Sequence, residues 1–125
     1  PITLSDALLM LIRRETESHT PENPGEIVAK LNALVDDKII RALYRASQKG
    51  VKIKLLVRGV CCLRPGVPGV SDNIEVRSIV GRFLEHSRIM YFKNSGDEEI
   101  YLSSADWMPR NLYRRVEVMF PVPEP

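Results

Sequence analysis

The sequence contains few cysteines, few histidines and no long hydrophobic run. Its 125 residues include two adjacent cysteines, Cys61 and Cys62, and two histidines, His19 and His86. A disulfide between neighbours is strained and two thiols alone make a poor zinc site, so we expect both cysteines to be reduced. Every apolar run is far shorter than a membrane-spanning helix requires, and we therefore predict no transmembrane segment.

An excess of charge of one sign is also missing. The net charge is only +2, which is too small to indicate bulk binding of nucleic acid. Hydrophobic residues make up 44% and charged residues 27%, as in an ordinary globular protein, and the length suits a single domain over residues 1–125. No signal-peptide pattern opens the sequence, so we expect a cytoplasmic protein, with a peripheral position at the inner membrane as the alternative. The first residue is proline rather than methionine, which favours a fragment of a longer chain.

Arginine is the more abundant cation. The sequence has twelve arginines and six lysines, and eight of the arginines follow residue 50. The planar guanidinium group suits two-point recognition of phosphate or carboxylate. Ordinary surface ion pairs are the competing explanation for more than half of them.

Hydrophobic periodicity predicts an α/β fold. One helix is expected over residues 3–18, capped by Thr3, and a second begins after Asp36 and ends at Gly50. Strands are predicted at residues 27–34, 51–57, 74–80, 87–93, 99–104 and 115–120. The first two strands and the helix between them form a parallel βαβ unit. We therefore predict a mixed β-sheet flanked by helices.

Polar residues gather at the predicted strand ends. Arg58 directly follows the strand 51–57, and His86 directly precedes the strand 87–93, of which Arg88 is the second residue. Ser103 and Ser104 close the strand 99–104. Ligands of open α/β sheets bind beyond the carboxyl ends of the strands. Histidine carries protons near neutral pH and arginine binds phosphoryl oxygens, so this set suits phosphoryl transfer. The alternative is a structural histidine with arginines at an exposed sheet edge.

Two further features are the alternation of the last predicted strand and the position of the second histidine, His19. In the last predicted strand, alternation puts Arg115 and Glu117 on one face. His19 lies in a loop that contains two prolines and a glycine, so we expect it to be exposed and without a function. Only one histidine is then placed for chemistry, so for a mechanism that needs two histidines the chain would hold half of the site.

Several stretches resemble a known family. The run His86-Ser87-Arg88, with a later small-residue segment that ends in Asp106, resembles one half of a phospholipase D-type site. The chain departs from that superfamily at two positions, because Arg88 stands where the superfamily has lysine and Asp106 where it has asparagine. A closer and highly specific resemblance is to bacterial polyphosphate kinases, in their last, phospholipase D-like domain. It covers roughly residues 25–122 and is carried by residues 57–66, 83–88, 101–112 and 114–118.

The resemblance implies an activity and a set of site residues. The family transfers the terminal phosphate of ATP reversibly to inorganic polyphosphate through a phosphohistidine and with Mg²⁺; the phosphohistidine and the Mg²⁺ ligands would lie outside this chain. Arg58 and His86 would contact the nucleotide phosphates, and His86 would be a general acid for the ADP leaving oxygen. Residues expected to line the active-site tunnel or to lie behind it are Arg88, Ser103, Ser104, Arg115 and Glu117. The implied partners are ATP or ADP, polyphosphate, the remaining domains and other copies in a homo-oligomer, without nucleic acid.

Two other functions stay open. One is a phospholipase D-like phosphodiesterase half, in which a dimer would bring two copies of His86 together. Activity of the isolated chain on a generic phosphodiester would support it. The other is a non-catalytic module that binds polyphosphate or nucleotide, which unchanged catalysis in a longer protein without His86 would support.

Overall fold

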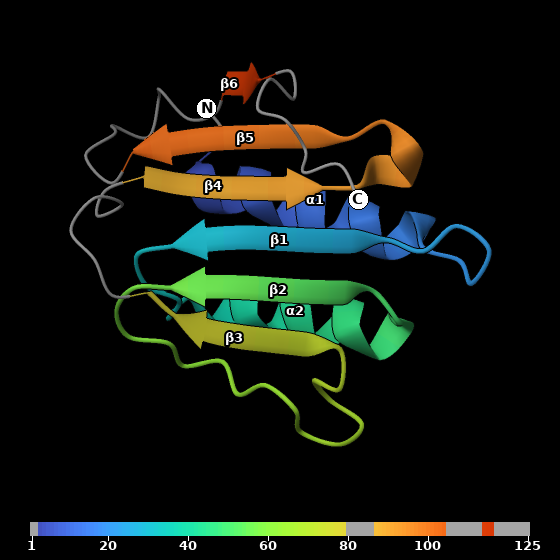
Figure 1. Cartoon of the computed structure of the whole chain (residues 1–125), viewed down its shortest axis with the longest axis horizontal. Helices are drawn as coiled ribbons and strands as arrows, with labels where there is room; N and C mark the ends of the chain where they lie inside the picture. Colours follow the sequence, from blue (N-terminus) through green and yellow to red (C-terminus); the bar gives the residue numbers. More distant parts are fainter. Residues whose placement is uncertain (1–2, 80–86, 105–113, 117–125) are drawn as a thin grey trace.

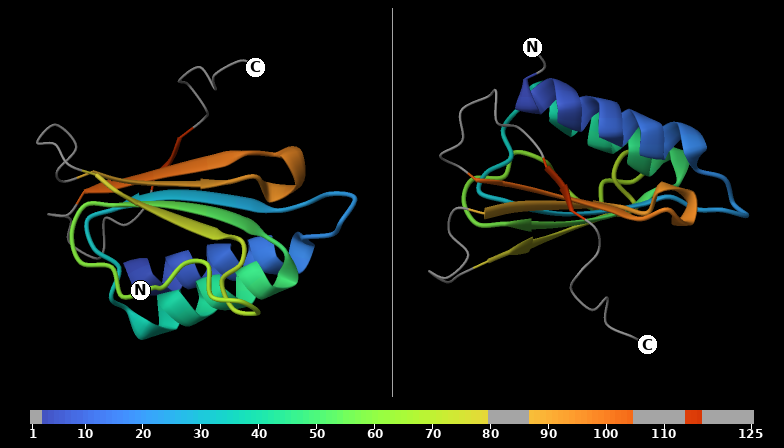
Figure 2. Two further views of the ribbon diagram at one scale, coloured as in Figure 1. Left: turned by 60° about the horizontal axis from the view of Figure 1, so that its bottom comes forward. Right: turned by 90° about the horizontal axis from the view of Figure 1, so that it is seen from above.

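A mixed six-stranded sheet, covered on one face by two helices, forms the domain (Figures 1 and 2). The computed structural model describes residues 3–79, 87–104 and 114–116. The elements are α1 (Leu4–Ser18), β1 (Glu26–Leu31), α2 (Asp37–Lys49), β2 (Lys52–Val57), β3 (Ile74–Ser78), β4 (Ser87–Phe92), the short 3₁₀ helix η1 (Asn94–Gly96), β5 (Glu99–Ser104) and β6 (Arg114–Val116). The prediction of an α/β fold with a mixed sheet is confirmed.

Side-chain caps set the ends of both helices. The Oγ1 atom of Thr3 accepts the backbone N–H three residues later at 3.0 Å, at the start of α1. Asp36 caps α2 by accepting the backbone N–H groups of Lys38 and Ile39 at 2.8 and 3.1 Å. Gly50 ends α2 with φ at 114°, a left-handed conformation that glycine adopts without steric cost. Each of these caps follows from the local sequence.

The sheet grows from its centre in two directions. Its order is β3-β2-β1-β4-β5-β6, with β1, β2 and β3 parallel and β4, β5 and β6 joined by antiparallel pairs. The chain builds one half through α2 and then returns to place β4 on the free side of β1. The boundary between β1 and β4 is therefore the topological switch point, where open α/β sheets form their binding crevices.

The parallel strands all end at the same edge of the sheet, which is where open α/β sheets bind ligands. Strands β1, β2, β3 and β5 end there and β4 begins there, on the left of Figure 1, whereas β6 begins opposite Leu102, inward from this edge. We call it the carboxyl edge and define it by Leu31, Val57, Ser78, Ser87 and Ser104.

The core lies between the sheet and the helices. Alternate strand residues point to the helices and are buried, because a half-covered sheet hides one face only. Burial of each large aliphatic side chain is worth about 1.5–3 kcal/mol. The most enclosed members are Ile12, Ile27, Leu43, Ala46, Val51, Ile53, Leu55, Val57, Met90 and Phe92.

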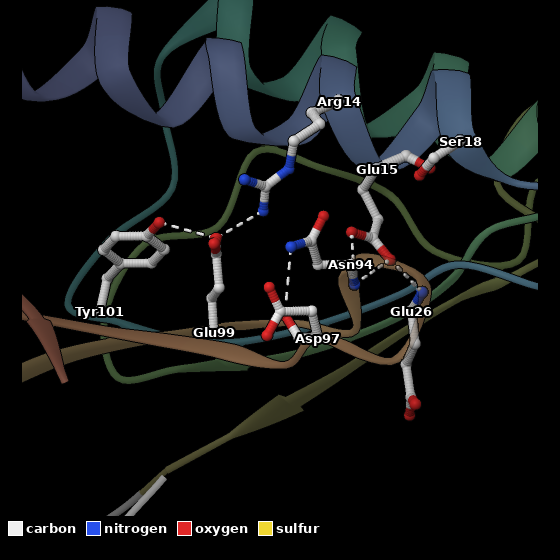
Figure 3. A network of polar contacts seen from close by, with 8 residues as sticks. All are labelled: Arg14, Glu15, Ser18, Glu26, Asn94, Asp97, Glu99 and Tyr101. Carbon is white, nitrogen blue, oxygen red and sulfur yellow. Dashed lines mark hydrogen bonds and ion pairs between the residues drawn. The ribbon is translucent and has the colours of Figure 1, made fainter. Parts of the chain in front are cut away.

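Polar contacts attach α1 to the opposite edge of the sheet (Figure 3). Arg14 forms an ion pair of 2.6 Å with Glu99, which is 6% exposed. The fully buried Glu15 accepts the backbone N–H groups of Glu26 at 3.0 Å and of Asn94 at 3.1 Å. These bonds connect α1 with the start of β1 and with the turn between β4 and β5.

Three expectations from the sequence need correction. The first strand ends at Leu31 rather than residue 34, because the N–H of Leu34 donates instead to the carbonyl of Val60 at 2.9 Å. The strand predicted over residues 74–80 ends at Ser78. His19 is half-buried rather than exposed, and its Nδ1 accepts the N–H of Gly25 at 2.9 Å, so it helps to close the loop before β1.

Candidate functional site

The carboxyl edge brings together several residues predicted for the site. Arg58 follows the end of β2, Ser103 and Ser104 end β5, and Ser87 begins β4. His86 precedes Ser87 in the chain but lies outside the described residues, as Glu117 does. The backbone register pairs Ser104 with Ser87 and Ser103 with Arg88. These chain positions therefore meet at one edge, although they are up to 46 residues apart in sequence.

Backbone hydrogen bonds fix the chain at Arg58. The N–H of Arg58 donates to the carbonyl of Leu31 at 3.0 Å, and the N–H of Gly59 donates to the carbonyl of Asn32 at 2.8 Å. A Cβ atom on Gly59 would lie 2.9 Å from that carbonyl oxygen, closer than Cβ atoms normally approach. Glycine thus permits the close approach that holds Arg58 beside the end of β1.

The loop after Arg58 is held by its own hydrogen bonds. The hydroxyl of the fully buried Ser71 donates to the carbonyl of Arg64 at 2.6 Å and accepts the N–H of Val67 at 2.9 Å. The hydroxyl of Tyr44, on α2, accepts the N–H of Arg64 at 2.9 Å. These bonds hold the loop against α2 on its way from the end of β2 to the start of β3.

Arg88 lines a cavity on the helix side of this edge. The cavity has a volume of about 250 Å³ and is lined by Ser5, Leu8, Leu31, Asp36 and Arg88 among others. The Nε atom of Arg88 is buried and has no hydrogen-bond partner within residues 3–79, 87–104 and 114–116. A buried guanidinium donor without a partner is costly unless a ligand or water satisfies it. The buried Nε atom of Arg88 therefore calls for an acceptor that the described residues do not provide.

The register also locates Arg115. Its backbone pairs with that of Tyr101 on β5, so it lies one strand farther from the centre of the sheet than Ser103. Burial and the hydrogen bond to the carboxylate of Glu99 raise the pKa of the Tyr101 phenol. Tyr101 also packs edge-on against Phe92, with ring centroids 6.2 Å apart. Tyr101, on the strand next to β6, is thus held by contacts with Phe92 and Glu99.

Sequence reasoning did not identify Asn32. It was included in a predicted strand, whereas in the structure it follows the end of β1, the strand beside the switch point. Its Oδ1 atom is buried without a hydrogen-bond partner in the described part of the chain. A polar residue that interrupts a buried apolar strand was the available signal.

Neither a metal cluster nor a membrane span is found in the described ranges. Within those ranges, no group of three or more histidine, cysteine, aspartate or glutamate side chains is placed to hold a metal ion. The helices seen there are too short or too polar to cross a bilayer. Cys61 and Cys62 are both free thiols.

Comparison with known proteins gives the family. The family model described as polyphosphate kinase C-terminal domain 2 matches residues 1–125. A polyphosphate kinase of Pseudomonas putida is 63% identical over 122 residues, which are 98% of this chain and 17% of that protein. One of Rhodopirellula baltica is 62% identical over 125 residues, covering all of this chain and 15% of the relative.

A solved structure agrees with these matches. The crystal structure of polyphosphate kinase from Porphyromonas gingivalis aligns with a TM-score of 0.73 and 45% identity, over 94% of this chain and 19% of that one. The chain therefore spans about a sixth of the length of the curated relatives that it matches. Together, the fold, the strand-end residues and the full-length family match show that this chain belongs to the polyphosphate kinase C-terminal domain family.

Proposed function

We propose that this chain is a single C-terminal catalytic domain of a polyphosphate kinase, which transfers the terminal phosphate of ATP reversibly to inorganic polyphosphate. The observation that carries the proposal is the meeting of Arg58, the start of β4 and the end of β5 at the carboxyl edge. Phosphoryl transfer depends mainly on positioning and on neutralising charge. Arginines at a switch point of the sheet supply both.

Arg58 and His86 would act on the nucleotide. Arg58 binds the phosphate oxygens through its planar fork, which also balances the charge that develops on them. In the forward step, a histidine of the preceding domain attacks the terminal phosphorus of ATP, a P–N bond forms and the P–O bond to ADP breaks. His86 donates a proton to the departing ADP oxygen as general acid. An oxygen at the end of polyphosphate then takes the phosphoryl group from the phosphohistidine.

The remaining predicted residues would act on the polymer or line its path. Arg88 lines the helix-side cavity, its buried Nε atom has no partner among the described residues, and it would bind a phosphate of the polymer there. Ser103, Ser104, Arg115 and Glu117 would line the tunnel or support the residues that line it. We propose that the domain works with the rest of its own polypeptide in a cytoplasmic or peripheral inner-membrane homo-oligomer. Mg²⁺ would act through ligands of the other domains.

Conservative replacement of Arg58 tests the proposal. Arg58→Lys in the full-length enzyme keeps the charge and loses the two-point contact. We expect turnover or nucleotide affinity to fall about ten- to a hundredfold, the worth of a charge-assisted hydrogen bond. Arg41→Lys is the matched control, since Arg41 is exposed on α2 and pairs only with the equally exposed Asp37. Equal and negligible effects of both replacements would remove Arg58 from the site.

The isolated chain provides a second test. It should bind phosphate-rich anions weakly and make no polyphosphate from ATP, because the second histidine lies in another domain. Robust ATP-dependent polymer synthesis by the 125-residue chain would contradict the half-site proposal. Hydrolysis of a generic phosphodiester by the same chain, lost in His86→Ala, would favour the phosphodiesterase alternative instead.

A further inference from the structure

Asn32 lies beside Arg58 at the carboxyl edge. The parallel register of β1 and β2 ends with Leu31 opposite Val57, so Asn32 and Arg58 are the next pair. The bond from the N–H of Arg58 to the carbonyl of Leu31 closes that last pair, and the bond from the N–H of Gly59 to the carbonyl of Asn32 at 2.8 Å keeps the two chains adjacent for one more step. Neighbouring strands are about 4.8 Å apart, which brings the two side chains within reach of each other.

Asn32 and Arg58 each follow a residue that is buried on the helix side. Leu31 and Val57 point to the helices and are 7% and 2% exposed. The following residues, Asn32 and Arg58, lie in bends just past the two strand ends, and neither of them lines the cavity on the helix side. That cavity is lined by Leu31 and Leu34 instead.

The Asn32 side chain carries an unused acceptor. Its Oδ1 atom is buried and has no hydrogen-bond partner in the part of the chain that the structure describes. Nearly all buried polar atoms in proteins have a hydrogen-bond partner. We therefore expect the Oδ1 atom to accept a hydrogen bond in another state of the protein, such as the substrate-bound state. The backbone carbonyl of Asn32 is already occupied by Gly59, which leaves the carboxamide as the group to explain.

Arg58 can supply that donor. A guanidinium group has five N–H donors, and a two-point contact with phosphate uses two of them. Contacts of this kind often tighten only when substrate is bound. We propose that Asn32 is a positioning residue, whose carboxamide oxygen accepts a hydrogen bond from the Arg58 guanidinium and holds that group toward the bound nucleotide phosphate.

This inference rests on the phosphate-binding role proposed above for Arg58, and a double-mutant cycle tests the two separately. The full-length enzyme is compared with Asn32→Ala, Arg58→Ala and the double variant, with kcat/KM for ATP and Tm measured on each. Asn32→Ala removes the carboxamide but keeps the backbone bond to Gly59. We expect it to lower kcat/KM about ten- to a hundredfold with the Tm unchanged. In the Arg58→Ala background it should have less than about a twofold effect, because the group that it positions is gone.

Control variants keep the result interpretable. Asn23→Ala makes the same change in the exposed loop before β1 and should leave kcat/KM unaltered. If Asn32→Ala fails to fold, Asn32→Ser takes its place, since serine suits turns and its shorter side chain does not reach the guanidinium. The same loss is expected from it.

Each outcome has one meaning. If Arg58→Ala is severely impaired but Asn32→Ala lowers kcat/KM by the same factor in both backgrounds, Asn32 acts independently and the inference is wrong while the proposed function stands. Wild-type kcat/KM in Asn32→Ala also refutes it. If Arg58→Ala retains full activity, the phosphate-binding role of Arg58 fails, and the inference fails with it.

Discussion

Replacement of Glu15 offers a direct test of how α1 is held to the sheet. Glu15 is fully buried, and its carboxylate accepts the backbone N–H groups of Glu26 and Asn94. Glu15→Ala leaves both donors without a partner. Hydrogen bonds to a charged group are worth about 1.5–3 kcal/mol each. Because water partly reaches the two donors, we take the lower end for both and expect a loss of about 3 kcal/mol.

Thermal unfolding of the 125-residue chain measures this loss. For a domain of this size, 1 kcal/mol corresponds to about 4 °C in Tm, so the expected decrease is about 12 °C. Glu17→Ala is the matched control, since Glu17 is on the same helix but exposed, and its Tm should change by less than about 2 °C. Equal Tm values for the two variants would refute the argument that the Glu15 contacts stabilise the fold.

Three further predictions concern catalysis, pH and the close approach at Gly59. His86→Ala in the full-length enzyme should lower turnover about a hundred- to ten-thousandfold with Tm unchanged. Wild-type turnover with a lowered Tm would end the assignment of His86 as general acid. A raised KM with normal turnover would indicate that His86 only binds phosphate. Burial and the bond to Glu99 raise the pKa of Tyr101, so its stabilisation is present below pH about 10 and is lost as pH rises through the raised pKa. Unfolding measured from pH 8 to 11 should therefore show a smaller alkaline loss for Tyr101→Phe than for the wild type, and parallel curves would contradict this. Gly59→Ala should cost about 1–3 kcal/mol in denaturant unfolding, because its Cβ would meet the carbonyl of Asn32 at 2.9 Å, and unchanged stability would show that the corner can relax.

Local patterns were enough to predict the elements. Thr3, Asp36 and Gly50 act as the helix caps that the sequence indicated, because capping depends on residues within one turn. The parallel pairing of β1 and β2 also followed, since a short βαβ unit has few alternatives. Strand ends were less certain, and Leu34 left the predicted strand because its N–H bonds to the loop after Arg58.

The strand-end positions of Arg58, Ser103 and Ser104 could also be predicted, because a strand end is a local feature. Their strand-end positions also predicted that they would converge at one end of the sheet, but the pairing that brings them there, β4 antiparallel to β1 across a long separation in sequence, is visible only in the structure. The importance of Asn32 was hidden for the same reason. That its Oδ1 atom is buried without a partner among the described residues becomes visible only when the burial and contacts of the neighbouring strands are known.

The sequence by itself determined the family, the helices and strands, and the residue types available for phosphate chemistry, because these depend on composition and short-range order. Only the tertiary structure decided the sheet order, the burial of Glu15 and of the Arg88 Nε atom, and the placement of Asn32 beside Arg58. Those features arise from contacts between residues far apart in the chain, and packing of the whole domain selects among the pairings that each segment alone would permit.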